Sequence, residues 1–314
     1  MTVTKTLMEW MALPQKRLQM LRGLIELVRP HNLVVAALTT LIGYGTVASI
    51  YGGDIVSSGY AYAALIVVLV AAGGYVINDY YDIETDMVAK PWRPIVSGRV
   101  SPGAARFYAY MLFTIGLIIA LVTCPNFIVF GFAVLNALLV HEYSRWIKRT
   151  GLPGNIVIAF NSASTIVFGA LYASCMIKGK VVLPSVALIP VLYAFLLVLG
   201  REFVKGIEDV KGDAIAGIGT LAVRFGVRTA YMASVAVLGL VVVLSPFPYI
   251  SGVYNMAYLI LALVVDVLIA YSLAILGRGV ARGLEDAIRA SRRARSALKL
   301  AFMVGALAFL AGLM

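Results

Sequence analysis

Four oxygen-bearing side chains lie close together directly after the apolar run 60–77: Asn78, Asp79, Asp82 and Asp86. If the run continues as a helix, all four fall within an arc of about 100°, and Glu84 points to the far side. Carboxylates this close repel one another, and partial burial raises the cost of keeping them charged. The arrangement therefore predicts a bound hard divalent cation, with Mg²⁺ as the first candidate. Taken alone, it would also suit a solvated helix end.

A second cluster follows the apolar run 181–200. In helical geometry, four charged side chains of the segment 202–213 face one way, within about 80°: Glu202, Lys205, Asp209 and Asp213. Two glycines, Gly206 and Gly212, weaken the expectation of an unbroken helix here. Because each cluster ends an apolar run, we expect the two to contribute to one site.

The elements that must position these residues are membrane helices. The chain has 314 residues, of which 61% are hydrophobic and only 13% charged, and its mean hydropathy of +0.94 excludes an ordinary soluble domain. We predict an all-α polytopic protein with nine transmembrane helices around a central cavity. Residues 1–32 form a basic amphipathic cytoplasmic segment, and residues 33–314 form one domain. The spans are about 33–51, 60–78, 104–123, 126–142, 153–174, 181–201, 227–245, 254–276 and 297–313.

The net charge is +11, and the positions of the basic residues fit a protein with nine membrane spans. Of the 26 Lys and Arg residues, all but Lys178 and Lys180 fall in the amino-terminal segment or in even-numbered loops. The positive-inside rule therefore places the amino terminus and both acidic clusters in the cytoplasm, and the carboxyl terminus outside. The strongly basic stretch 278–299 is interpreted as a surface helix held by anionic headgroups. The charge thus indicates membrane topology and not nucleic-acid binding.

Several further side chains border the two clusters, each with two interpretations. Arg29 and Asn32, just before the first span, are either interfacial anchors or face the cavity. Tyr143, at the end of the fourth span, is by default an aromatic residue of the membrane interface. The cations serve topology, anion binding or both. The residues are Arg29, Asn32, Lys90, Arg93, Tyr143 and Lys148.

Three other residues carry weaker signals. Cys124 and Cys175 indicate neither a disulfide framework nor a metal site, and we expect each to fill space in an apolar span. Asp266 is a lone acid within the eighth span and needs a partner or a cavity. The two acidic clusters, each followed by a basic loop and a helix, hint at an old duplication.

Two carboxylate clusters, nearby cations and an apolar bundle suggest a substrate with a polyanionic end and a long lipid end. A polyprenyl diphosphate fits. Mg²⁺ and basic side chains would stabilise the departing diphosphate, so that an allylic cation forms. Apolar walls would keep water from that cation while an acceptor attacks. A cation-coupled transporter is the rival class, but only Asp266 resembles a mid-membrane coupling site.

The motif Asn78-Asp79-x-x-Asp82-x-x-x-Asp86, followed by Arg-Pro-x-x-Ser-Gly at 93–98, resembles the first signature of the UbiA-type intramembrane prenyltransferases. The pair Asp209-x-x-x-Asp213 resembles their second. Within that family, residues 201–213 and Tyr143 look most like the branch of archaeal digeranylgeranylglyceryl phosphate synthases, although Gly206 replaces an acid often found there. The resemblance covers essentially the whole chain.

The resemblance implies Mg²⁺-dependent transfer of a geranylgeranyl group from its diphosphate to geranylgeranylglyceryl phosphate, forming the second ether bond of archaeal membrane lipids. It implies that Asn78 and the five acids bind Mg²⁺, with Asp79, Asp82, Asp209 and Asp213 as the catalytic residues. Substrate contact is expected from Arg29, Asn32, Lys90, Arg93, Tyr143, Lys148, Glu202 and Lys205. The alternative is an aromatic acceptor such as 4-hydroxybenzoate, because the spacing of the acids reports only on the donor.

Overall fold

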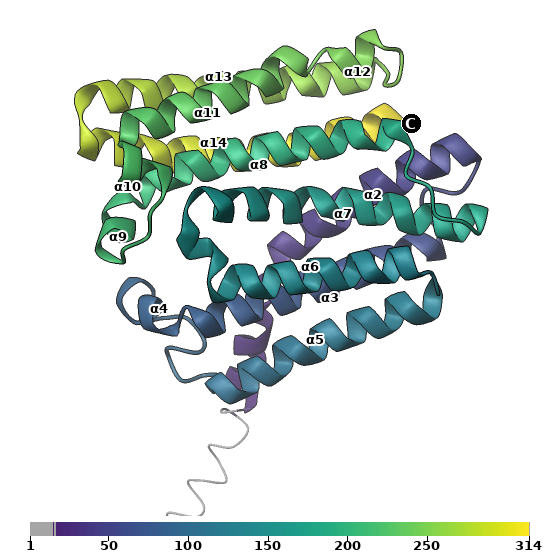
Figure 1. Cartoon of the computed structure of the whole chain (residues 1–314), viewed down its shortest axis with the longest axis horizontal. Helices are drawn as coiled ribbons and strands as arrows, with labels where there is room; N and C mark the ends of the chain where they lie inside the picture. The colour runs from purple at the N-terminus through teal and green to yellow at the C-terminus, as the bar shows by residue number, and fades with distance from the viewer. Residues whose placement is uncertain (1–14, 16, 314) are drawn as a thin grey trace, which may run out of the picture.

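The computed structural model describes residues 15 and 17–313, and in this part of the chain nine helices are long and apolar enough to cross a membrane. They run side by side, with the short helices α4, α9 and α10 all at one end (Figure 1). The first span continues a helical segment, residues 17–27, into α2. The prediction of nine spanning helices is confirmed. The long helices are α2 (Pro30–Tyr51), α3 (Ser58–Tyr81), α5 (Pro102–Thr123), α6 (Phe127–Arg145), α7 (Leu152–Lys178), α8 (Leu188–Glu208), α11 (Val227–Leu244), α13 (Met256–Arg282) and α14 (Leu284–Leu313).

Short elements connect these helices. Those at the end of the bundle that carries the acidic segments are α4 (Ile83–Ala89), η1 (Ile147–Thr150), α9 (Val210–Ile215) and α10 (Leu221–Phe225). The others are η2 (Ser185–Ala187) and α12 (Phe247–Ile250). Several boundaries follow from local sequence: the side chains of Ser57, Ser101, Asn126 and Asn255 accept hydrogen bonds from the first-turn backbone amides of α3, α5, α6 and α13.

Small residues let neighbouring helices approach closely. A Cβ atom at Gly43 on α2 would collide with the backbone carbonyl of Ile166 on α7, and one at Gly169 would collide with that of Thr40. In a bilayer, where lipid is as apolar as a helix surface, such close backbone contact is a main source of helix association. The α2–α7 pair is thus held at the centre of the bundle, next to the helices that end at the acidic segments.

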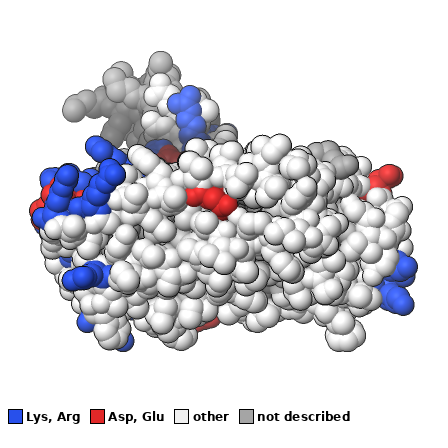
Figure 2. All heavy atoms as spheres, turned by 90° about the horizontal axis from the view of Figure 1, so that it is seen from above, with Lys and Arg blue, Asp and Glu red and all other residues white. Residues whose placement is uncertain are grey.

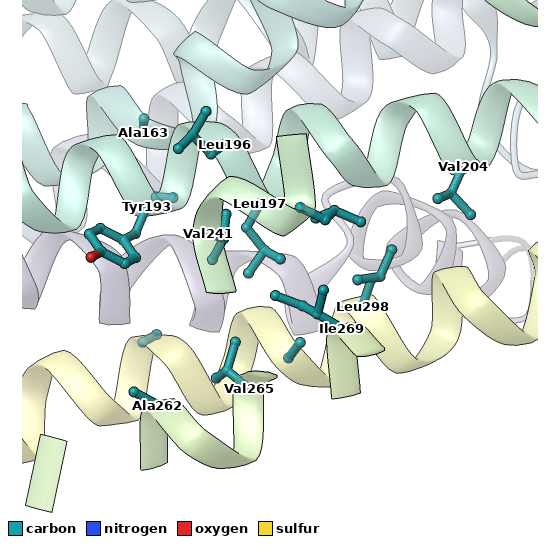
Figure 3. Close-up of a cluster of buried hydrophobic side chains, with 14 of the residues drawn as sticks. Ala163, Tyr193, Leu196, Leu197, Val204, Val241, Ala262, Val265, Ile269 and Leu298 are labelled. Carbon is teal, nitrogen blue, oxygen red and sulfur yellow. The ribbon is translucent and has the colours of Figure 1, made fainter. Parts of the chain in front are cut away.

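A buried apolar cluster joins the second half of the chain. Leu197 and Val204 on α8 face Val241 on α11, Ile269 on α13 and Leu298 on α14 (Figure 3). All five side chains are less than a tenth exposed. This cluster fixes α8, and therefore the start of the second acidic segment, against the carboxyl-terminal hairpin.

The surface agrees with a membrane position. Seen from above, Lys and Arg gather mainly at the end of the molecule that carries α4 and α9, whereas the middle is almost free of charge (Figure 2). The basic stretch 278–299 is not a separate surface helix, and that interpretation was wrong. Instead α13 extends to Arg282, the chain turns at Gly283 with φ of 121°, and α14 begins at Leu284.

The predicted segment 1–32 is only partly within the described residues, since 1–14 and 16 lie outside them. Its helical part packs against the loop between α4 and α5: Leu27 is fully buried, and Arg99 donates a 2.6 Å hydrogen bond to Glu26. Gly23 lies so close to Val100 that a Cβ there would require Val100 to shift. The segment therefore braces that loop in addition to any contact with the membrane surface.

The prediction for the cysteines was wrong, because Cys124 and Cys175 form a disulfide. Cys124 follows the last residue of α5, and Cys175 lies in the last turn of α7, with their Cα atoms 6.5 Å apart. The two residues are separated by 51 positions, so no local pattern indicated that they pair. The bond joins α5 and α7 at the end of the bundle opposite the acidic segments.

We expect Cys124→Ser to lower the free energy of unfolding by about 2–4 kcal/mol while leaving the opposite end of the bundle intact. Thermal unfolding of the detergent-solubilised protein measures this, with the Cys124→Ser/Cys175→Ser double variant as control. The double variant should melt with the single variant, because either change removes the same bond. Wild-type protein that reacts with a thiol reagent before reduction would contradict the pairing.

Candidate active site

The first acidic segment begins on α3 and bends at Asp82. Asp82 follows the last residue of α3 with φ of −94° and ψ of 6°, and α4 starts at the next residue. Helical hydrogen bonds nevertheless continue across the bend, from the Asp82 amide to the Asn78 carbonyl (3.0 Å) and from the Asp86 amide to the Asp82 carbonyl (2.8 Å). The acids therefore keep nearly the spacing that one continuous helix would give them.

The second acidic segment repeats this geometry. α8 ends at Glu208, Asp209 adopts φ of −89° and ψ of 0°, and α9 follows. The Asp209 amide donates to the Lys205 carbonyl (3.0 Å), and the Asp213 amide donates to the Asp209 carbonyl (2.8 Å). The break falls at the first acid of the Asp-x-x-x-Asp pair in both segments, and not at Gly206 or Gly212.

Cations from several elements surround the first segment. Asp79, which is 5% exposed, accepts a 2.6 Å hydrogen bond from Arg29 and a second one from Arg93. Arg93 also lies 3.4 Å from Asp86, and Lys90 is 3.6 Å from the same carboxylate. A single arginine thus touches two of the predicted acids, so these two acids do face a common side.

Lys148 brings a distant part of the chain to this site. It lies in η1, just after α6, and its Nζ is 2.5 Å from Asp82 Oδ1. Its side chain is only 14% exposed, and this burial lowers the pKa of Lys148 despite the nearby carboxylate. Lys148 is therefore a largely desolvated cation that points at the bend of the first acidic segment.

The second acidic segment has a different set of charged neighbours. Glu202, 8% exposed, lies 3.0 Å from Arg201 and 3.7 Å from Lys205. In the described part of the chain, neither Asp209 nor Asp213 has a Lys, Arg or His partner within 4.0 Å. Burial, with the neighbouring Asp209 as the second cause, raises the pKa of Asp213 to about 6. This acid pair is the one most in need of a cation.

The other predicted residues lie near the same end of the bundle. Tyr143 is in the last turn of α6, and Asn32 is in the first turn of α2. The guanidinium of Arg29 lies over the Tyr75 ring at 5.2 Å. Asn78 lies on α3 beside Asp79.

The donor set fits a hard divalent cation. It consists of carboxylate and amide oxygens, which suit Mg²⁺. Burial raises the pKa of Asp86, and its buried Oδ2 atom accepts no hydrogen bond from any described residue. No three acids in the described part of the chain lie close enough together to hold a metal ion as they stand. The carboxylates of the first segment instead form ion pairs with four basic side chains: Arg29, Arg93, Lys90 and Lys148.

Apolar cavities lie further inside the bundle. One is lined by Thr39 on α2, Leu197 on α8 and Phe309 on α14, among others. Another lies between α3, α6 and α7, with Asn136 and Asn161 on its wall. Asp266 borders the first cavity. Its hydrogen-bond partner is Ser245, whose hydroxyl donates to the Asp266 carboxylate at 2.5 Å.

The sequence did not single out three contributors. Arg201 contacts Glu202, and its only signal was its place at the start of the second motif. Glu208 receives the Arg295 guanidinium at 2.9 Å, which ties the end of α8 to α14. This contact joins residues 87 positions apart, so nothing local in the sequence indicated it.

Comparison with known proteins identifies the family of this chain. Residues 36–288 match the UbiA prenyltransferase family. Digeranylgeranylglyceryl phosphate synthase of Sulfolobus acidocaldarius is 38% identical over 91% of this chain and 95% of its own length. The Methanopyrus kandleri protein of the same name is 37% identical over 94% of this chain and 100% of its own length.

Solved structures extend the comparison. A structure described as a digeranylgeranylglyceryl phosphate synthase superposes with a TM-score of 0.73 at 31% identity, covering 94% of this chain and 98% of that one. A UbiA homologue from Archaeoglobus fulgidus bound to DMAPP and Mg²⁺, at 17% identity and a TM-score of 0.61, shares the fold; it covers 90% of this chain and 99% of that one. With nine membrane-spanning helices among the described residues, two Asp-x-x-x-Asp segments at one end and a family match over most of its length, the chain belongs to the UbiA prenyltransferase family.

Proposed function

We propose that this prenyltransferase joins a geranylgeranyl group from its diphosphate to the free hydroxyl of geranylgeranylglyceryl phosphate. The observation that carries the proposal is the position of both acidic segments at one end of an apolar bundle, with pockets further inside. A diphosphate binds at the charged end, while prenyl chains extend into the bundle. The names of the relatives above support a glycerol phosphate acceptor.

The chain's own residues then have separate tasks. Asn78, with the acids of both segments, would hold Mg²⁺, which supplies positive charge to the departing diphosphate. Arg93, Lys90, Lys148 and Lys205 contact the phosphate oxygens, and Arg29, Asn32, Glu202 and Tyr143 position the substrates. Lys148 is suited to its task because a desolvated cation interacts strongly with developing negative charge.

The reaction breaks the bond between donor C1 and oxygen, and the diphosphate leaves with the electron pair. Apolar walls around the cavities keep water away from the allylic carbon. The acceptor oxygen forms the ether bond and then loses its proton to the diphosphate or to water. A strong general base is unnecessary, because the proton becomes acidic once the oxygen has bonded to carbon.

We also propose that the acidic segments face the cytoplasm and that the carboxyl terminus is outside. The clustering of Lys and Arg at that end supports this orientation (Figure 2). The disulfide at the opposite end supports it independently, because such bonds persist in oxidising compartments. The transporter alternative is not supported, since Asp266 is hydrogen-bonded to Ser245 and the family is one of prenyltransferases.

A prenyl-transfer assay on lipid-reconstituted protein tests the function. Labelled geranylgeranyl diphosphate and Mg²⁺ are offered with geranylgeranylglyceryl phosphate or with 4-hydroxybenzoate, in separate reactions. We expect an ether product only with the glycerol phosphate. Product only with the aromatic acid would overturn the proposed acceptor while leaving the donor assignment in place, and product with neither would overturn the function.

A further inference from the structure

His141, one turn before the end of α6, contacts a tyrosine from each of two neighbouring helices. Its Nε2 atom lies 3.2 Å from the hydroxyl of Tyr110 on α5 and 3.4 Å from the hydroxyl of Tyr81 on α3. The rings of Tyr81 and His141 also meet edge to face, with their centroids 5.7 Å apart. The His141 side chain is only 17% exposed. His141 therefore ties α6 to both α3 and α5.

Glu142 holds the other side of the imidazole. Its Oε1 atom is 2.8 Å from His141 Nδ1. A carboxylate can only accept a hydrogen bond, so Nδ1 carries a hydrogen, and Nε2 of the neutral ring then accepts from a tyrosine hydroxyl. The second carboxylate oxygen, Oε2, accepts a 2.8 Å hydrogen bond from the indole of Trp146. Glu142 thus connects the imidazole to Trp146.

Trp146 is the residue at which the chain leaves α6. Its backbone amide donates to the Glu142 carbonyl at 3.0 Å, and its φ of −149° and ψ of −33° redirect the chain into η1. Lys148 follows two residues later, within η1. Because Glu142 binds both the backbone amide and the indole of Trp146, the path of the backbone toward Lys148 depends on Glu142.

The same two parts of the chain also meet at the first acidic segment. Tyr81 is the last residue of α3, directly before the bend at Asp82, and Lys148 donates to Asp82 Oδ1 at 2.5 Å. The contacts that lead from Tyr81 through His141 to Trp146 therefore run beside the ion pair of Asp82 and Lys148. A lysine has a flexible four-carbon stem, so a backbone that is fixed before it restricts where its ammonium group lies.

This group of side chains adds little to the buried apolar core. Trp146 and Tyr110 are 54% and 45% exposed, and His141 belongs to none of the buried apolar clusters of the described residues. Losing a single hydroxyl or the imidazole therefore leaves the core packing of the bundle in place. An effect of such a change on turnover then reports on the site at the end of α3.

We propose that His141 is a positioning residue that, through Tyr81 and Glu142, sets Lys148 against Asp82. The polar contacts of His141 among the described residues are with Tyr81, Tyr110 and Glu142, so it acts through these neighbours and not on the substrate. The inference rests on the proposed function, in which Lys148 contacts the phosphate oxygens. It extends that function to side chains on the far side of the α3 bend from the lysine.

Tyr81→Phe and Tyr110→Phe are a matched pair of variants, since each removes one hydroxyl beside the same nitrogen. Tyr81 leads directly into the bend, whereas α5 carries none of the predicted site residues. We expect Tyr81→Phe to lower kcat about 10-fold and Tyr110→Phe less than about 3-fold, because a small displacement of a catalytic group is costly in rate. The KM for the donor should change less than kcat. Equal losses from both variants would show a packing role and overturn the inference, and so would no loss from either.

A double-variant cycle tests whether His141 acts through Lys148. We expect His141→Leu to lower kcat about 10- to 100-fold in the wild-type background. In the Lys148→Gln background the same change should cost less than about twofold, because there is no ammonium group left to position. Losses that multiply would show that His141 acts elsewhere and would overturn the inference. His141→Gln should restore part of kcat, since its amide can still bond to a tyrosine hydroxyl.

Chemical labelling of Lys148 separates this inference from the proposed function, because it needs no turnover. An amine-reactive acyl reagent is applied to reconstituted protein without substrates, and mass spectrometry follows each lysine. Wild-type Lys148 should react slowly, since its side chain is largely buried and ion-paired. His141→Leu should raise that rate at least about threefold by loosening the turn, while Lys90 reacts as before. If labelling responds but wild type forms no ether, the function fails and the positioning stands; an ether product with unchanged labelling overturns the positioning.

Discussion

Asp209→Asn should reduce the rate of prenyl transfer at least about 10³-fold, equivalent to about 4 kcal/mol of transition-state stabilisation. Among the described residues, neither Asp209 nor Asp213 has a Lys, Arg or His partner within 4.0 Å, so we expect a divalent metal to make its strongest contact there. Asp82→Asn should have an effect of the same order, because Asp82 occupies the same bend in the first segment. Turnover with saturating Mg²⁺ measures both.

The fold should survive Asp209→Asn. Without metal, the substitution removes repulsion between Asp209 and Asp213, so the unfolding temperature should stay the same or rise. Added Mg²⁺ should stabilise wild type by about 2.7 kcal/mol at one hundred times its dissociation constant, and the variant by much less. Glu84→Gln is the matched control, since Glu84 is exposed and has no ion pair among the described residues. Near-normal turnover of Asp209→Asn would refute the metal assignment.

Lys148→Gln should lower the rate about 10²- to 10³-fold, the usual effect of losing one preorganised donor to developing negative charge. Lys148 is mostly buried and points at Asp82, so water replaces its charge poorly. The loss should appear mainly in kcat, because the charge on the departing diphosphate grows in the transition state. Single-turnover measurements with labelled donor give the chemical step directly.

Lys90→Gln provides the comparison. Lys90 lies 3.6 Å from Asp86 but is 47% exposed, so solvent screens its charge. We expect less than about a tenfold loss from this variant. If the two variants were equally impaired, net charge at this end of the molecule would explain the result, and the specific placement of Lys148 would not.

The sequence by itself determined the spanning helices and the chemistry at their ends. Nine apolar runs were visible because a bilayer requires about 20 consecutive apolar residues per helix. The acids were visible because several carboxylates on one face of a helix repel one another, so their clustering indicates a bound cation. The spacing Asp82-x-x-x-Asp86 and Asp209-x-x-x-Asp213 is local, so helical geometry alone predicted that each pair faces one way.

Sequence patterns could not predict features that depend on contacts between distant parts of the chain. The bends at Asp82 and Asp209 recur at the same point in both segments, although the neighbouring sequences differ. The basic stretch 278–299 contains the turn of a helical hairpin, because α13 and α14 pack along their length. The charge pattern of the stretch did not indicate this hairpin. Tertiary packing, and not propensity, chose these conformations.

Only the tertiary structure decided which side chains meet. Lys148 reaches Asp82 across 66 positions, and Arg295 reaches Glu208 across 87. Cys124 and Cys175 come together because α5 and α7 end at the same side of the bundle. Periodicity specifies the face of a helix but not its neighbour, since the neighbour depends on how all nine helices pack at once.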